Sequence, residues 1–230
     1  MNILHLPFEF DVIRLQEDLK NTYENDWVEH HNKQAYTGEW SATSLRSIDG
    51  TNREIVALEN RVYYDTPLLN KCFYIQQVIN TFEAEVEAVR FMKLGAHSVI
   101  KEHTDKGSCF EDDLVRLHIP ISSNKNVEFI VGGEKENMNA GNCYYMNADA
   151  PHSVVNESDE ERVHLLLDCR VNDWLREIFK QSGIIQENYK YSSKSINDDN
   201  VNEIIENLKI INTEISLHMA QELEQKRDAK

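Results

Sequence analysis

Two histidines and one aspartate near the middle of the chain have the types and spacing of a metal site. His103 and Asp105 stand two residues apart at the end of a strand-like run, and His152 follows Pro151 at the start of another. In extended backbone, residues two apart point to the same side, so one imidazole and one carboxylate converge. Two histidines and one carboxylate on one face of a metal leave three positions open, as in non-haem Fe(II) oxygenases. These three residues are the candidate ligands, although a lone H-x-D motif also arises in surface loops.

Two other strand-like runs set an arginine and a histidine on one face. Alternation pairs Arg162 with His164, and Arg116 with His118, each opposite aliphatic residues. If the aliphatic sides pack against helices, both pairs point inward. A buried guanidinium needs an anionic partner, and a bidentate carboxylate fits it best. A metal with open positions beside internal arginines is what 2-oxoglutarate requires. The alternative for Arg162 is an ordinary surface ion pair.

Short apolar runs, separated by Gly, Asn, Asp and Ser, dominate the middle of the chain. Regularly spaced short strands favour a sandwich or barrel over alternating strand–helix units. Helical spacing predicts helices over residues 11–23, 69–82 and 173–180, and the polar stretch 25–39 is expected to be a loop. The expected strands are residues 85–94, 98–102, 114–121, 127–131, 143–147 and 162–168.

The C-terminal part has a different character. Residues 1–182 are expected to form the barrel domain with its N-terminal helices, 183–200 a polar linker, and 201–230 a C-terminal helix ending near residue 225. That helix carries a short apolar seam, which favours packing back on the barrel and leaves a homodimer through this helix as the alternative. The seam consists of Val201, Ile204, Leu208, Ile211 and Ile215.

Composition limits the partners and the compartment. The 230 residues carry a formal charge of −16, which disfavours nonspecific binding to nucleic acid or to an anionic membrane. We find no secretory signal pattern and no apolar stretch long enough to cross a bilayer. The four cysteines are widely spaced and have no paired zinc spacing, which indicates reduced structural thiols. A cytoplasmic protein is expected.

Five segments, taken in order, make the chain resemble a known family. The chain resembles the aspartyl/asparaginyl β-hydroxylase family of Fe(II)- and 2-oxoglutarate-dependent dioxygenases, in particular its bacterial proline cis-hydroxylases. The resemblance covers about residues 27–175, including an earlier segment at 36–47, and implies a mainly β fold with flanking helices. Its core would be a double-stranded β-helix, a jelly-roll or cupin-like barrel, followed by a C-terminal helical extension. The five segments are residues 89–95, 100–105, 115–120, 151–156 and 162–165.

The resemblance also implies roles for the site residues. The three candidate ligands would bind iron, and Arg162 would bind the distal carboxylate of 2-oxoglutarate. Arg116 and His118 would contact the other carboxylate of this cosubstrate, or the substrate. The peptidyl aspartyl hydroxylases of animals resemble this family but lack the carboxylate ligand, whereas this chain has Asp105. That difference favours the branch of small amino-acid hydroxylases.

The expected function is hydroxylation of a free amino or imino acid, such as a proline-like molecule. Fe(II), 2-oxoglutarate and O2 would be the cofactors, and succinate and CO2 would be released. One alternative is β-hydroxylation of Asp or Asn in a peptide or carrier-bound substrate. A second, from another class, is a cupin-type metal-binding protein without oxygenase activity, which would not need Arg162.

The substrate residues are expected in two places. Arg46 and Arg116 would clamp a substrate carboxylate, and Trp40 would wall off its apolar side, although a surface arginine at 46 and a core tryptophan at 40 are the ordinary alternatives. The remaining histidines singled out as non-ligands are His5, His30, His31, His97 and His218.

Overall fold

The structure is a computed structural model that describes residues 2–58, 61–183, 191 and 196–228. It divides into two compact units, Met1–Ile184 and Ile185–Lys230, and each is described by itself. The expected linker at 183–200 falls largely outside the described residues.

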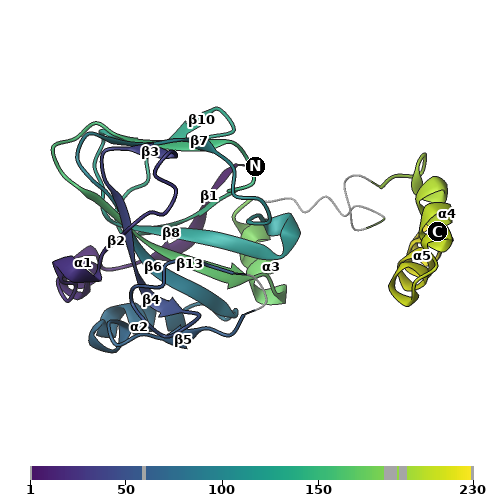
Figure 1. Cartoon of the computed structure of the whole chain (residues 1–230), viewed down its shortest axis with the longest axis horizontal. Helices are drawn as coiled ribbons and strands as arrows, with labels where there is room; N and C mark the ends of the chain where they lie inside the picture. Colours follow the sequence, from purple (N-terminus) through teal and green to yellow (C-terminus); the bar gives the residue numbers. More distant parts are fainter. Residues whose placement is uncertain (1, 59–60, 184–190, 192–195, 229–230) are drawn as a thin grey trace. The chain divides into compact units, whose positions relative to one another are not determined.

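Two antiparallel sheets face each other in the first unit (Figure 1). This arrangement confirms the predicted mainly β, jelly-roll class. The larger sheet runs β1 (Ile3–Glu9), β11 (Asn142–Met146), β8 (Leu114–Ser122), β13 (Arg162–Arg170), β6 (Val86–Leu94), β4 (Trp40–Ser47), β2 (Val28–Glu29), with β5 (Tyr64–Asp65) paired to β4. The smaller sheet runs β10 (Glu134–Glu136), β9 (Val127–Val131), β12 (His152–Asn156), β7 (Ser98–His103), β3 (Tyr36–Thr37).

Strand alternation gives the larger sheet two apolar faces with different partners. On β13, Leu165 and Leu167 pack in a cluster with helix residues such as Ile75. The residue between them, Leu166, belongs to a second cluster that includes Phe129 of the smaller sheet. On this strand, Leu166 and the residues that alternate with it in steps of two therefore face the smaller sheet. Leu165 and Leu167 face the opposite side, where the helices pack.

Helices cover the outer face of the larger sheet (Figure 1). Side chains cap the N-termini of the first and third helices, because Asp11 accepts bonds from the backbone of residues 13 and 14, and Asn172 accepts one from Leu175. The helices are α1 (Val12–Leu19), α2 (Phe73–Asn80) and α3 (Asp173–Gln181), with short 3-10 turns η1 (Glu24–Asp26), η2 (Leu69–Lys71) and η3 (Phe110–Asp112).

Two long strands were not among those expected. β1 contains Pro7, which weakens its strand pattern, but β1 is at the edge of its sheet, where a proline is tolerated. β4 lies inside the sheet and is buried along almost its whole length, but five of its eight residues are Ser, Thr or Arg, so it lacks the apolar run expected of a buried strand.

In the described part of the C-terminal unit, two helices occupy the range for which a single helix was predicted. α4 (Val201–Ile211) ends at Asn212, whose φ of 53° is left-handed, and α5 (Glu214–Asp228) follows. Asparagine tolerates this conformation and commonly ends helices. Val201 packs against the second helix, whereas Ile211 and Ile215 are exposed, so the predicted seam is not one continuous face.

Two features bear on the compartment. Among the described residues, we find no helix with the length and apolar character required to cross a membrane. All four cysteines are buried and unpaired, and burial raises the pKa of the Cys72 thiol to about 12. Such thiols remain protonated and unreactive near neutral pH.

Candidate metal centre on the inner face of the barrel

The structure brings the three predicted ligands together at one end of the smaller sheet. His103 ends β7, His152 begins the adjacent β12, and the two are direct partners in the ladder. Asp105 follows β7, and its backbone N–H donates to the carbonyl of Ala148 at 2.8 Å. One ligand atom from each side chain lies within 4.8 Å of the other two. Bonds of about 2.1 Å to one ion require separations of at most about 4.2 Å, so small side-chain adjustments suffice for the three to share a metal.

Both imidazoles are oriented by the backbone. Nδ1 of His103 is 2.8 Å from the carbonyl oxygen of Lys101, and Nδ1 of His152 is 3.0 Å from that of Ala150. A carbonyl only accepts, so each Nδ1 carries the proton and each Nε2 keeps a free lone pair. Metal-binding histidines are commonly held in this way. Burial also lowers the pKa of His152, which favours the neutral form that a ligand requires.

Asp105 is held by a chain of buried charges. Arg116 donates to Asp105 at 2.8 Å and to Asp168 at 2.8 Å, and Arg90 donates to Asp168 at 2.6 Å. Burial alone would raise the pKa of Asp105, but the charges of Arg116 and His103 outweigh it and lower the pKa. The carboxylate is therefore ionised and fixed in position before any metal binds.

Arg162 is the opposite case, a buried cation without an anion. It is 2% exposed and the largest fully buried side chain among the residues that the structure describes, and its guanidinium carbon lies 4.7 Å from the centroid of the Phe129 ring. It donates to Nδ1 of His164 at 3.2 Å, but Nε and Nη1 have no hydrogen-bond partner among the described residues. Burial lowers its pKa to about 9. An unpaired buried guanidinium is costly, which indicates a place for an anionic ligand.

His118 and His164 surround the same place. Both are buried on the inner face, and the Nε2 atoms of both have no partner in the described part of the chain. Burial holds the pKa of His118 well below its usual range, and the charges of Arg162 and Arg116 add to this effect. His118 therefore lies within electrostatic reach of both arginines, and neutral imidazoles adjoin the unpaired cation.

The predicted substrate clamp is not assembled. A register shift on β4 between Ser44 and Arg46 places Arg46 opposite Val89, a residue of the outer cluster. Arg46 donates there to Asp65 at 2.6 Å and to the carbonyl of Val86 at 3.0 Å. Arg116 is on the inner face with its donors directed at the two aspartates, so the two arginines do not converge. The β-bulge is the physical reason, because it changes the face to which a side chain belongs.

Trp40 does lie beside the metal candidates. It is 7% exposed and belongs to the inner cluster, and its ring centroid is 6.2 Å from that of His103. Its indole Nε1 donates to the Met92 sulfur at 3.0 Å. It is thus a core tryptophan next to a candidate ligand, and its expected role in walling off the apolar side of a substrate stays a prediction.

Two residues at the site had no predicted role there. Arg90 stands two residues before Met92 on β6. Strand alternation therefore predicts that both side chains face the smaller sheet. His30 was set aside as a non-ligand, but its ring stacks on Trp40 at a centroid distance of 3.6 Å. Its position depends on the packing of an irregular segment, which leaves no periodic signal in the sequence.

Fold and site together define a class: a jelly-roll protein whose inner face carries a His-Asp-His cluster and an unpaired arginine. The family model described as Aspartyl/Asparaginyl beta-hydroxylase matches residues 9–171. The chain belongs to this family.

The relatives are distant. The chain is 27% identical over 163 residues to the L-proline cis-4-hydroxylase of Rhizobium meliloti (strain 1021), a match covering 70% of this chain and 58% of that protein. The chain thus spans less than two thirds of this relative's length. A 2OG-Fe(II) oxygenase-family oxidoreductase from Burkholderia pseudomallei is 12% identical, with a TM-score of 0.49 over 69% of this chain and 78% of that one. A viral collagen prolyl hydroxylase from Paramecium Bursaria Chlorella virus-1 is 8% identical, with a TM-score of 0.45 over 75% and 97%.

Proposed function

We propose that this protein is an Fe(II)- and 2-oxoglutarate-dependent dioxygenase that hydroxylates a free amino or imino acid. The observation that carries the proposal is the unpaired Arg162, buried on the inner face of the barrel that also carries His103, Asp105 and His152. A metal site alone would fit many functions. A metal site together with an unpaired buried guanidinium inside the same barrel fits a dicarboxylate cosubstrate.

The ligand roles follow from the donor set. His103 and His152 would offer Nε2 and Asp105 one carboxylate oxygen to Fe(II), leaving the other oxygen for Arg116. When bound, Fe(II) with 2-oxoglutarate and O2 supplies the oxidant for C–H hydroxylation, with release of succinate and CO2. Arg116 is a positioning residue here, because it keeps Asp105 ionised and oriented.

Arg162 would bind the C5 carboxylate of 2-oxoglutarate. Its free Nε and Nη1 offer two donors, and the planar fork of a guanidinium matches a carboxylate. The adjacent His118 and His164 have unused Nε2 atoms that would hydrogen-bond the same cosubstrate. The enclosed position excludes water from this ion pair and so strengthens it.

A small substrate is the favoured choice. The L-proline cis-4-hydroxylase of Rhizobium meliloti is named for a free imino acid, and its match includes the segment with the candidate ligands. β-Hydroxylation of Asp or Asn in a peptide or carrier-bound substrate is the second candidate, supported by the description of the family. A cupin without oxygenase activity would offer no anionic ligand to pair with the buried guanidinium of Arg162.

One assay tests the proposal. The purified chain is incubated with Fe(II) and 2-oxoglutarate, and succinate is measured across the free amino acids, beginning with L-proline. We expect succinate release that one or a few amino acids stimulate, together with a product 16 Da heavier. Absence of succinate with every amino acid and with Asp- or Asn-containing peptides would overturn it.

A cytoplasmic location and a homodimer through the C-terminal unit remain part of the proposal. The four buried free thiols support a reducing compartment. The exposed Ile210, Ile211 and Ile215 near the turn of the α4–α5 hairpin provide an apolar surface for a second copy. Molar mass in solution, compared with that of Ile211→Lys, tests the dimer.

A further inference from the structure

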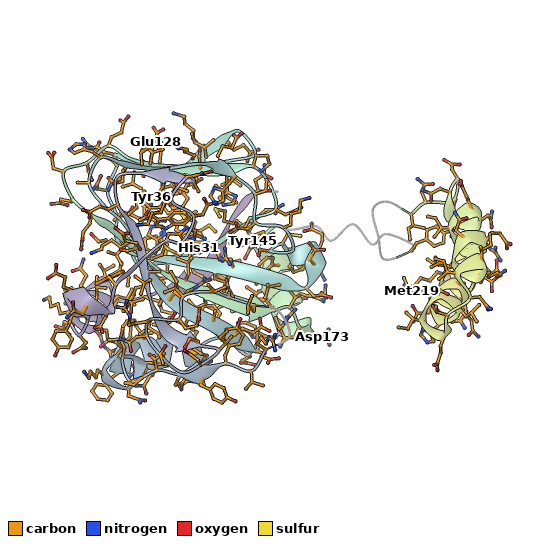
Figure 2. All side chains as sticks on the ribbon, in the orientation of Figure 1. His31, Tyr36, Glu128, Tyr145, Asp173 and Met219 are labelled. Carbon is orange, nitrogen blue, oxygen red and sulfur yellow. The ribbon has the colours of Figure 1, made fainter. Side chains whose placement is uncertain are left out.

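His30 lies in the segment that joins the edges of the two sheets. β2 is the edge strand of the larger sheet and β3 that of the smaller one, and residues 30–35 connect them. The backbone N–H of His30 donates to the carbonyl of Trp40 at 2.8 Å. His31 in this segment and Tyr36 at its end are labelled in Figure 2. The segment therefore borders the space between the sheets, where the candidate ligands lie.

An aromatic row links His30 to the metal candidates. The His30 ring lies flat on Trp40, with centroids 3.6 Å apart and planes 16° apart. Trp40 in turn contacts His103, whose ring is 4.2 Å from that of His152. The charges of Asp105 and His103 act on His30 as well, so His30 shares their surroundings.

The imidazole of His30 has an unused nitrogen. Its Nδ1 is buried and has no hydrogen-bond partner in the described part of the protein. Burial, followed by the influence of His31, lowers the pKa of His30 to about 4, so the ring is neutral at neutral pH. Leaving a buried nitrogen unpaired costs about 1–3 kcal/mol. A ligand that supplies the partner removes this cost.

We propose that Nδ1 of His30 accepts a hydrogen bond from the amino or imino N–H of the substrate, and so makes the site selective for free amino acids. This inference rests on the proposed function and specifies its substrate side. The ammonium of an amino acid needs an acceptor, but the carboxylates of Asp105 and Asp168 are both engaged by Arg116. A neutral imidazole supplies an acceptor without adding charge, and Trp40 fixes its plane.

The test uses three variants. His30→Phe keeps a ring on Trp40 and removes the nitrogen. His30→Asn keeps a polar atom near the position of Nδ1. His5→Phe is the matched control, because His5 is an exposed histidine on β1, at the opposite edge of the larger sheet from β2, and its ring also lies against an aromatic ring, that of Tyr144. L-proline binding is measured by calorimetry with Ni(II) and 2-oxoglutarate present, so that no turnover occurs, and N,N-dimethyl-L-proline, which has no N–H, serves as the comparison ligand.

We expect His30→Phe to weaken L-proline binding about tenfold or more, to leave that of the dimethyl compound unchanged, and to keep the 2-oxoglutarate KM within about twofold. His30→Asn should recover most of the affinity, and His5→Phe should match wild type. Unchanged L-proline binding in His30→Phe would overturn the inference, as would an equal loss for both ligands. A wild-type protein that releases succinate but binds no free amino acid would also overturn it, while leaving the oxygenase proposal intact. Absence of succinate release would count against the proposed function itself.

Discussion

His152 lies directly opposite His103 across the β7–β12 ladder, with ring centroids 4.2 Å apart. Two strands distant in sequence therefore position the pair, and each ring is oriented by a carbonyl of its own strand end. The separation of the two Nε2 atoms depends on strand register. A shift of one residue would turn one histidine to the other face of the sheet.

The first prediction concerns the metal. His103→Ala, Asp105→Ala and His152→Ala should each abolish turnover and weaken Ni(II) binding by at least about 100-fold, because two remaining ligands hold a divalent ion poorly. Metal content after dialysis and succinate release are the measurements. Asp105→Gly is the informative variant, because it removes the carboxylate and puts no side chain in its place. Wild-type activity in His152→Ala would refute the ligand assignment.

The second prediction concerns Arg162 and links stability to function. Arg162→Met removes an unpaired buried charge, so the free protein should gain about 1–4 kcal/mol in its free energy of unfolding. The same variant should lose the rise in Tm that 2-oxoglutarate gives the wild type. Arg162→Lys should raise the 2-oxoglutarate KM strongly, because an ammonium lacks the bidentate fork. Calorimetric scans with and without 2-oxoglutarate measure the change in Tm, and steady-state kinetics measure the KM. An unchanged 2-oxoglutarate KM in both variants would mean that Arg162 has only a structural role.

A third prediction concerns Asp168, which is shared by Arg90 and Arg116. Asp168→Asn leaves two buried guanidinium groups undercompensated and should cost about 3–5 kcal/mol in the free energy of unfolding. The matched control is Asp65→Asn, which breaks the half-exposed pair with Arg46 and should cost about 1 kcal/mol or less. Urea unfolding measures both. Equal losses in the free energy of unfolding would mean that burying these ion pairs has little influence on their contribution to stability.

The fourth prediction separates backbone strain from crowding. Gly38 and Gly133 have almost the same φ, 82° and 83°. A Cβ at residue 38 would stand 2.2 Å from the Ser98 hydroxyl oxygen on β7, whereas nothing lies within 4 Å of one at residue 133. Gly38→Ala should therefore be the more destabilising by about 1–3 kcal/mol. Comparable losses in the two variants would show that Ser98 moves aside freely.

The sequence predicts some parts of this site and not others, for physical reasons. His103 and Asp105 are two residues apart at the end of β7, and Arg162 and His164 are two residues apart on β13. Strand alternation was therefore enough to predict that the side chains of each pair point to the same face. Arg46 was expected to join Arg116 in a substrate clamp, but a β-bulge, which leaves no mark in composition, sets it on the outer face. The break at Asn212 was missed because apolar spacing continues across it. His30 depends on a tertiary stack with Trp40, which no periodicity encodes.

The series of ion pairs that begins at Asp105 and runs through Arg116 to Asp168 continues to Arg90. Arg90 donates to Asp168 and also, at 3.0 Å, to the carbonyl of Ile55 in the segment after β4. One end of this series is a candidate metal ligand, and the other is backbone outside the regular strands. Binding energies are reciprocal, so if metal binding changes how firmly Arg90 holds Ile55, displacement of Ile55 changes metal affinity by the same factor. Ni(II) affinity in Arg90→Met tests whether this coupling exists, and a changed affinity would make the Ile55 segment a place from which an event away from the ligands alters metal binding.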